Sequence, residues 1–337
     1  MSLDLPTIWA FVIAFAVALY VVMDGFDLGI GILFLRFTVG QERDSAMNSV
    51  APVWDGNETW LVLGGGGLMA AFPLAYAIIL PALYAPMIAM LLGLVFRGVA
   101  FEYRWRDKAH RRWWDAGFCA GSIVATLAQG VTLGALLQGI TIEGRHYAGG
   151  WWDWLTPFSL LCGLSLLIGY ALLGVGWIIW KSEGDLHDKA RTLAKLLMPA
   201  LLVALAAVSA YTPFLEGKYW QRWFVFPGLF VTVPMPLISA GVALMLWRAI
   251  AKGWDGAVFL WTLALFGTAM AGLAVSFWPD VIPGRVTIWE AASPPESQAF
   301  MLIGAGILIP IILGYTGWAY YVFRGKLTDD GYHAHDH

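Results

Sequence analysis

Nine apolar stretches of membrane-spanning length fill most of this chain, and they constrain its fold more than any other feature. The stretches cover residues 7–36, 58–80, 82–104, 114–139, 157–181, 192–212, 223–249, 256–278 and 299–323. A helix needs roughly 20 apolar residues to cross a bilayer. Only 13% of the 337 residues are charged, whereas soluble domains carry about 25%. The sequence therefore predicts an all-α integral membrane protein with nine transmembrane helices.

The distribution of lysine and arginine predicts which helix ends face the cytoplasm. If the N-terminus lies outside, fifteen of the 20 basic residues fall in inner loops, four fall in outer loops, and Arg97 lies within a helix. Because cytoplasmic loops are enriched in Lys and Arg, we expect the N-terminus outside and the C-terminus in the cytoplasm. Residues 1–325 are expected to form one polytopic membrane domain, and residues 326–337 a polar cytoplasmic tail.

Two aspartates interrupt the first apolar stretch, in the segment YVVMDGFDLGIG at residues 20–31. Asp24 and Asp27 are three residues apart, so they share one face of a helix. A carboxylate at the centre of a bilayer costs at least about 2.5 kcal/mol and is a functional candidate by default. The predicted topology places both aspartates in the cytoplasmic half of the first helix.

Further ionisable residues are expected in the same half of the next two helices. Asp55 and Glu58, in VAPVWDGNETWL, lie in the first turn of the second helix, where the helix dipole stabilises negative charge. Arg97, in LVFRGVAFEYR, lies within the third helix, and Glu102 follows it towards the inner interface. We therefore expect these side chains to converge in the cytoplasmic half of the first three helices.

Two interpretations of this cluster are open. In the structural one, Arg97 pairs with an aspartate and the other charges cap helix ends. In the functional one, the carboxylates form a proton-uptake path from the cytoplasm. The path would use Asp55 as the entry, followed by Glu58, Asp24 and Asp27, with Arg97 and Glu102 as electrostatic partners.

The positions of the histidines argue against a haem site in this chain. All six lie in predicted loops or in the tail: His110, His146, His187, His333, His335 and His337. A haem buried in a helical bundle usually needs an axial histidine. We therefore expect the chain alone to bind no haem and no other metal, and any redox centre to lie in another subunit. The chain also shows no extended basic face, so nucleic acid is not an expected partner.

Six motifs occur in an order that resembles subunit II of the cytochrome bd-type quinol oxidases. They are YVVMDGFDLGIG, NSVAPVWDGNETWL, FRGVAFEYR, LLQGI, GDLHDKAR and TIWEAASPPESQAFM. The resemblance runs from the first helix to the last. The GDLH loop and the short connection between the sixth and seventh helices resemble the cyanide-insensitive branch of that family.

The resemblance implies a haem-free subunit of a bacterial inner-membrane oxidase that oxidises quinol and reduces oxygen to water. Subunit I is expected to hold the b-type haems, haem d and the quinol site. Subunit II is expected to form two four-helix bundles plus one helix. Lipid, a structural quinone and small accessory membrane subunits are further candidate partners.

The resemblance also carries roles for individual residues. Asp55, in the motif WDGN, matches the aspartate associated with cytoplasmic proton entry, and Asp24 and Asp27 match the family's acid pair. The residues expected to pack against subunit I are Trp54, Gly56, Asn57 and Gly25. No residue of this chain is expected to be catalytic in the strict sense. A secondary transporter of protons or cations, or a purely structural subunit, remains as an alternative function.

Overall fold

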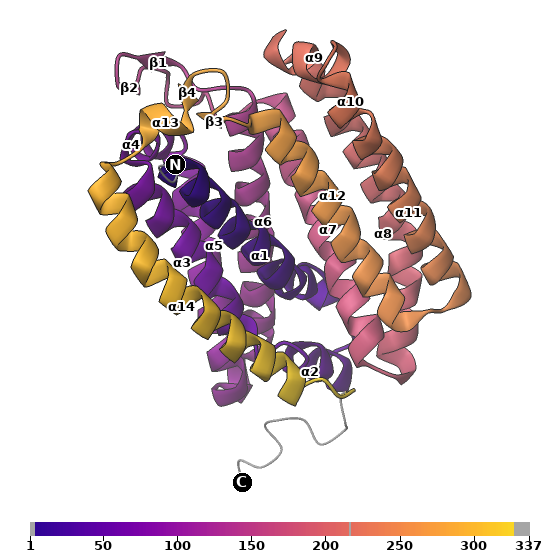
Figure 1. Cartoon of the computed structure of the whole chain (residues 1–337). Coiled ribbons are helices and arrows are strands. Elements are labelled where there is room, and N and C mark those ends of the chain that lie inside the picture. The colour runs from indigo at the N-terminus through magenta and orange to yellow at the C-terminus, as the bar shows by residue number, and fades with distance from the viewer. Residues whose placement is uncertain (1–3, 216, 327–337) are drawn as a thin grey trace.

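The computed structural model describes residues 4–215 and 217–326, and these residues form a helical membrane protein (Figure 1). Eight described helices are long and apolar enough to cross a membrane. They are α1 (Leu5–Leu33), α5 (Tyr84–Arg106), α6 (Arg111–Leu137), α7 (Pro157–Lys181), α8 (Gly184–Tyr211), α11 (Pro234–Lys252), α12 (Asp255–Phe277) and α14 (Pro295–Val322). A ninth apolar segment is divided into α3 (Trp54–Ala71) and α4 (Pro73–Ala82), which are bent by 119° at Phe72.

Short elements join the long helices. The helical ones are η1 (Phe34–Arg36), α2 (Gln41–Asn48), η2 (Lys108–His110), η3 (Thr212–Phe214), α9 (Gly217–Phe224), α10 (Leu229–Thr232) and α13 (Ile288–Ala291). Two small antiparallel hairpins pair β1 (Ile142–Glu143) with β2 (His146–Tyr147), and β3 (Asp280–Ile282) with β4 (Val286–Thr287). The helical membrane fold predicted from the sequence is thus confirmed.

Two of the nine predicted stretches are interrupted by proline. The second, expected as one helix over residues 58–80, turns sharply where Pro73 opens α4. The seventh, expected over residues 223–249, is divided among α9, α10 and α11, and α11 begins only at Pro234. Proline lacks an amide hydrogen and clashes with the preceding turn, so it ends a helix and can begin the next one.

The long helices form two groups, which meet where α7 packs against α6 and α1. In the first group α1 packs against α3 and α6, and α5 packs against α6. In the second group α7 packs against α8 and α12, and α11 packs against α12. Figure 1 shows α14 lying diagonally across the side of the first group, where it contacts α1 and α3. Two four-helix groups with one additional helix result, as the resemblance implied.

An ion pair and lysine hydrogen bonds connect the helices at the end of the molecule that carries α2, called here the α2 end. Lys189 in α8 binds Glu42 in α2, with a shortest distance of 2.6 Å from Nζ to Oε2. Lys181 at the end of α7 donates to the carbonyl oxygens of Phe323 and Gly325, at 2.5 and 3.2 Å. These contacts fix the chain just after α14 against α7. Residues 327–337 of the predicted tail lie outside the described residues.

Candidate functional site

Asp24 and Asp27 lie in the last part of α1, in a segment where every residue from 24 to 31 is buried. Their relative exposures are 0% and 1%. Glycines bring α7 against this segment: a Cβ added to Gly25 would lie 2.8 Å from the Tyr170 ring, and one added to Gly29 only 1.8 Å from the Tyr170 carbonyl oxygen. The close approach of α1 and α7 therefore removes the aspartates from solvent.

Arg97 of α5 is the cation that compensates Asp24. Its Nη1 lies 2.6 Å from Asp24 Oδ1 and 3.5 Å from Glu58 Oε1. The guanidinium is 1% exposed, and it lies over the Trp54 ring at 5.9 Å from the ring centre. Buried charges are found paired because an isolated charge is costly in a low dielectric. One arginine thus joins α1 and α3, the two helices that carry the acids.

The solvent exposure of the acidic side chains decreases from the first turn of α3 towards the buried Asp24. Asp55 is exposed, and Glu58 one turn later has a side chain that is 27% exposed. Arg97 and Asp24 behind Glu58 are fully buried. The helix therefore presents an outer carboxylate at the α2 end, then an intermediate one, and then the buried pair.

Asp27 is held by a neutral side chain rather than by a cation. Asn57 donates from Nδ2 to Asp27 Oδ2 at 2.7 Å, and also to the carbonyl oxygen of Met23 at 3.3 Å. Tyr320 of α14 donates to Asn57 Oδ1 at 3.0 Å. The amide thus connects α1, α3 and α14 at the depth of the acid pair.

A chain of neutral groups lies one turn from Asp24, in the contact between α1, α6 and α7. Tyr20 precedes Asp24 by four residues on α1 and is 4% exposed. Gln129 donates from Nε2 to the Tyr20 oxygen at 2.7 Å, and Tyr170 donates to Gln129 Oε1 at 3.0 Å. Asp27 is therefore bound by an amide that a tyrosine also contacts, whereas Gln129 joins the hydroxyls of Tyr20 and Tyr170.

The structure brings together five of the residues singled out from the sequence: Asp24, Asp27, Asp55, Glu58 and Arg97. Glu102 lies outside this cluster, because it follows Arg97 by five residues and so faces another side of α5. Its carboxylate is 55% exposed and has Arg106 at 3.9 Å. The expectation that Glu102 joins the cluster is therefore wrong.

The residues given a packing role differ in their surroundings. Gly25 and Asn57 are buried against this chain's own residues, as described above. Trp54 is partly buried and stacks on Phe101 with ring centres 5.0 Å apart. Gly56 is also partly buried, and a Cβ added there would meet no atom within 4 Å. The contribution of these four positions to subunit packing stays a prediction.

A second ionic cluster, at the α2 end, was not foreseen from the sequence. Asp115 of α6 accepts from Arg43 at 2.7 Å and from Arg104 at 2.5 Å. Asp44 of α2 pairs with Arg104 at 2.8 Å and with Arg111. The only sequence signal was an aspartate close to the start of an apolar helix. These pairs fix α2 beneath α5 and α6 and concentrate arginines at this end.

The Glu42 carboxylate, which binds Lys189 between α2 and α8, stays ionised at neutral pH. Burial raises the pKa of Glu42, but hydrogen bonds from Lys189 and Thr38 outweigh it, so the net pKa lies below the usual value. A carboxyl group with a lowered pKa keeps its stabilising interaction until the pH falls through that pKa.

The described residues contain no group of three or more His, Cys, Asp and Glu arranged to hold a metal ion. The described histidines lie at helix ends or in loops: His110 in η2, His146 in β2 and His187 in the first turn of α8. Cys119 and Cys162 are buried, unpaired thiols within α6 and α7.

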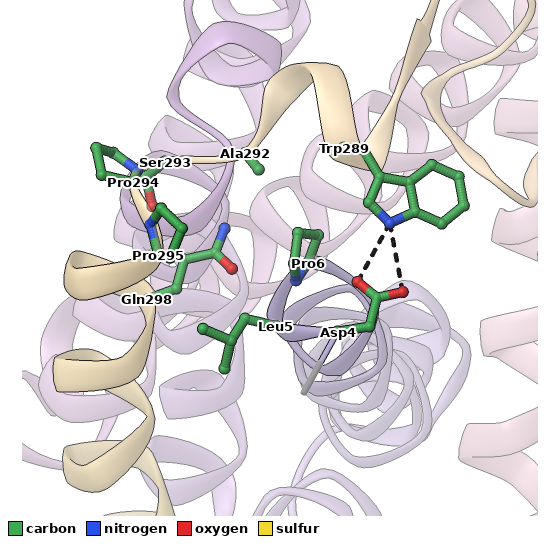
Figure 2. A pocket seen from close by; sticks show the side chains of 9 residues that line it. All are labelled: Asp4, Leu5, Pro6, Trp289, Ala292, Ser293, Pro294, Pro295 and Gln298. Carbon is green, nitrogen blue, oxygen red and sulfur yellow. Dashed lines mark hydrogen bonds between the residues drawn. The ribbon is translucent and has the colours of Figure 1, made fainter. Parts of the chain in front are cut away.

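A hollow of about 620 Å³ lies at the opposite end from α2, where α1 begins next to α13 and the start of α14 (Figure 2). It is lined by Asp4, Leu5, Pro6, Trp289, Ala292, Ser293, Pro294, Pro295 and Gln298. Trp289 donates to both oxygens of Asp4 at 3.2 and 3.3 Å. A hydrogen bond from Thr7 lowers the pKa of Asp4.

Three of the lining residues are prolines, which have no amide hydrogen. Within the described residues, the buried Ser293 Oγ and Gln298 Oε1 form no hydrogen bond. The expected structural quinone stays a prediction.

The fold and the acid cluster together define a polytopic helical membrane protein whose buried carboxylates are reached from one end. Comparison with known proteins adds the family. The chain belongs to the cytochrome bd terminal oxidase subunit II family, whose family model matches residues 5–323.

Similar proteins span nearly the whole chain. Cytochrome bd-I ubiquinol oxidase subunit 2 of Escherichia coli (strain K12) is 29% identical and covers 98% of this chain and 97% of its own length. Cytochrome bd ubiquinol oxidase subunit 2 of Bacillus subtilis (strain 168) is 30% identical and covers 96% and 97%. These relatives are subunits of quinol oxidases, so the chain is a subunit of an oxygen-reducing quinol oxidase.

A solved structure shares the fold. A chain in the structure of the bd oxidase from Geobacillus thermodenitrificans matches with a TM-score of 0.71 at 15% sequence identity. The match covers 96% of this chain and all of that chain. At this identity the likeness establishes the arrangement of helices, and the functional argument rests on the family and on the site.

Proposed function

We propose that this chain is the haem-free subunit II of a cytochrome bd-type oxidase and that it takes up protons from the cytoplasm for the reduction of oxygen. The observation that carries the proposal is the exposure gradient from Asp55 through Glu58 to the buried Asp24. Reduction of oxygen to water consumes protons, and a carboxylate can relay them when its proton affinity suits the pH. The oxygen-reducing haem would lie in the partner, subunit I.

The direction of uptake follows from where the arginines gather. Arg43, Arg104 and Arg111 lie at the α2 end, next to the start of α3. Positive residues mark the cytoplasmic side of membrane proteins, so Asp55 would face the cytoplasm. In this arrangement Asp55 collects a proton from water and Glu58 receives it. Arg97 would keep Asp24 anionic until the proton arrives.

Replacement of the entry carboxylate tests the path. Asp55→Asn keeps the size of the side chain and removes its ability to exchange a proton. We expect quinol-driven oxygen consumption by the assembled oxidase to fall at least about ten-fold, with unchanged haem content. Asp55→Glu should restore much of the rate, because it restores a carboxylate.

Asp185→Asn is a matched control. Asp185 is also an exposed aspartate in the first turn of a helix, α8, at the same end of the molecule. We expect it to leave oxygen consumption unchanged. Normal turnover in an assembled Asp55→Asn enzyme would contradict the proton role and leave the chain as a structural subunit.

A further inference from the structure

The hollow between the beginnings of α1 and α14 is lined by two residues whose buried oxygen atoms form no hydrogen bond. Gln298 is 0% exposed and Ser293 is 9% exposed, and neither Gln298 Oε1 nor Ser293 Oγ has a partner within the described residues. A buried polar atom without a partner costs about 1–3 kcal/mol. The volume of the hollow, about 620 Å³, is typical of a site for a small molecule or a headgroup.

The orientation of the Gln298 amide is fixed by the chain itself. Its Nε2 donates to the carbonyl oxygen of Ala71 at 3.2 Å. The reversed amide would bring Oε1, which is an acceptor, against that carbonyl oxygen, which cannot donate. Oε1 is therefore the atom that remains for a bound group, and Figure 2 shows it directed towards the start of α1.

The other side of the hollow carries a negative charge. Asp4 accepts hydrogen bonds from Trp289 and Thr7, and these donors are neutral. The hydrogen bond from Thr7 lowers the pKa of Asp4, so its carboxylate is ionised at neutral pH. The two segments that line the hollow, residues 4–6 and 289–298, contain three acidic residues and no Lys, Arg or His.

The lining groups together require a ligand that is positively charged and donates hydrogen bonds. Asp4 and Gln298 Oε1 can only accept, and the Ser293 hydroxyl can accept as well as donate. A quinone head offers carbonyl acceptors, which only Ser293 could bind. A calcium or magnesium ion prefers several carboxylates, and the lining supplies only Asp4. We propose that the hollow binds the primary ammonium group of an ethanolamine phospholipid between Asp4, Gln298 and Ser293.

The surroundings of the hollow favour a lipid over a free amine. Trp278 and Trp289 are 42% and 48% exposed, and exposed tryptophans are enriched where lipid headgroups meet water. From the hollow towards the membrane centre, Leu5, Ile8 and Phe15 share one face of α1, and none of them is fully buried. This apolar face suits an acyl chain that continues from a headgroup in the hollow.

The headgroup can be tested on the assembled oxidase after delipidation in detergent. Native mass spectrometry would compare phosphatidylethanolamine with phosphatidylcholine of the same acyl chains. Both headgroups carry a positive nitrogen, but only that of ethanolamine has N–H donors. We expect the first phosphatidylethanolamine to bind at least about ten-fold more tightly than phosphatidylcholine, because hydrogen bonds to charged groups are the stronger ones.

Two substitutions locate the bound lipid in the hollow. Asp4→Asn keeps the size of the side chain and removes its charge, so it should weaken binding of phosphatidylethanolamine about ten-fold and leave phosphatidylcholine unaffected. Ser293→Ala removes one hydroxyl and should weaken the same binding about three-fold. Haem content reports whether each variant is assembled, and Ser293→Ala provides the comparison if Asp4→Asn lowers it.

Glu296→Gln is the matched control. Glu296 is also an exposed acidic residue at this end of the molecule, in the first turn of α14, but it does not line the hollow. We expect this variant to bind phosphatidylethanolamine as the wild type does. An equal loss of binding in Glu296→Gln and Asp4→Asn would reduce the effect to general surface charge and overturn the proposal.

Three further results would also overturn it. The first is equal affinity of the wild-type oxidase for the two lipids. The second is free ethanolamine that binds as tightly as phosphatidylethanolamine, which would assign the hollow to a soluble amine. The third is displacement of the bound phosphatidylethanolamine by a short-chain ubiquinone, which would assign the hollow to a quinone.

Discussion

Arg97 is the residue on which the charge balance of the acid cluster depends. Removal of one partner of a buried ion pair leaves the other charge uncompensated and typically costs about 3–5 kcal/mol. We therefore expect Arg97→Gln to destabilise the protein by about this amount, because Asp24 is 0% exposed and binds Arg97 at 2.6 Å. The thermal unfolding temperature and the yield of the purified oxidase measure the effect.

A second substitution shows whether the loss of stability in Arg97→Gln comes from the uncompensated charge of Asp24. The double variant Arg97→Gln/Asp24→Asn removes both charges, so its stability should lie closer to wild type than that of Arg97→Gln. Equal losses in the single and double variants would mean that Arg97 stabilises the protein by packing, for example against Trp54, and not by compensating Asp24.

The acid cluster could be predicted because its residues are charged, whereas the neutral side chains next to it could not. Carboxylates and an arginine in apolar helices stand out because their burial is costly. Asn57 had been assigned to subunit packing, and its bond to Asp27 was not foreseen. Gln129 and Tyr170 gave no signal, because neutral polar residues and tyrosines are common in such helices. Which side chains meet across α1, α6 and α7 depends on helix rotation, which the sequence pattern does not specify.

The crossing of α1 and α7 is the contact between elements that most tightly limits side-chain size. A Cβ on Gly29 would lie 1.8 Å from the Tyr170 carbonyl oxygen and 2.8 Å from the Gly174 amide nitrogen. Both atoms belong to the backbone, so the helices would have to separate. We expect Gly29→Ala to cost about 3 kcal/mol or more and to lower the yield of folded protein, measured by size-exclusion chromatography in detergent.

Gly241→Ala is the matched control for this prediction. Gly241 lies in α11, and a Cβ there would meet no atom within 4 Å. Since alanine favours a helix over glycine by about 1 kcal/mol, this variant should be as stable as wild type or slightly more so. A Gly29→Ala protein with wild-type yield and unfolding temperature would show that the two helices can part without loss.

Helix number was predictable at the scale of elements, whereas helix breaks were not. The hydropathy of residues 58–80 is continuous across Phe72, yet α3 and α4 are bent by 119° there. Proline marked the candidate positions, but a membrane helix can also carry proline in its interior, as α14 does at Pro310. The run Gly64–Gly67 shows the same limit. Gly64 and Gly67 face α1, whereas a Cβ added to Gly65 or Gly66 would meet no atom within 4 Å.

At the scale of the whole molecule, the position of the acid cluster separates an oxidase subunit from a transporter. Transporter sites commonly lie near the bilayer midplane between structural repeats. Here Asp24 and Asp27 lie in the last part of α1, and Asp55 and Glu58 in the first turns of α3, so the cluster is displaced towards the α2 end. A displaced, one-sided cluster suits uptake from one compartment by a larger complex.

Purification from the native membrane tests this assignment directly. We expect an affinity-tagged chain to copurify with a larger haem-bearing partner and to show a haem absorption spectrum, because the chain belongs to a family of cytochrome bd oxidase subunits. The same chain expressed without its partner should be colourless, because the haems are expected in that partner. A homogeneous, colourless protein that exchanges cations for protons in lipid vesicles would instead identify a transporter.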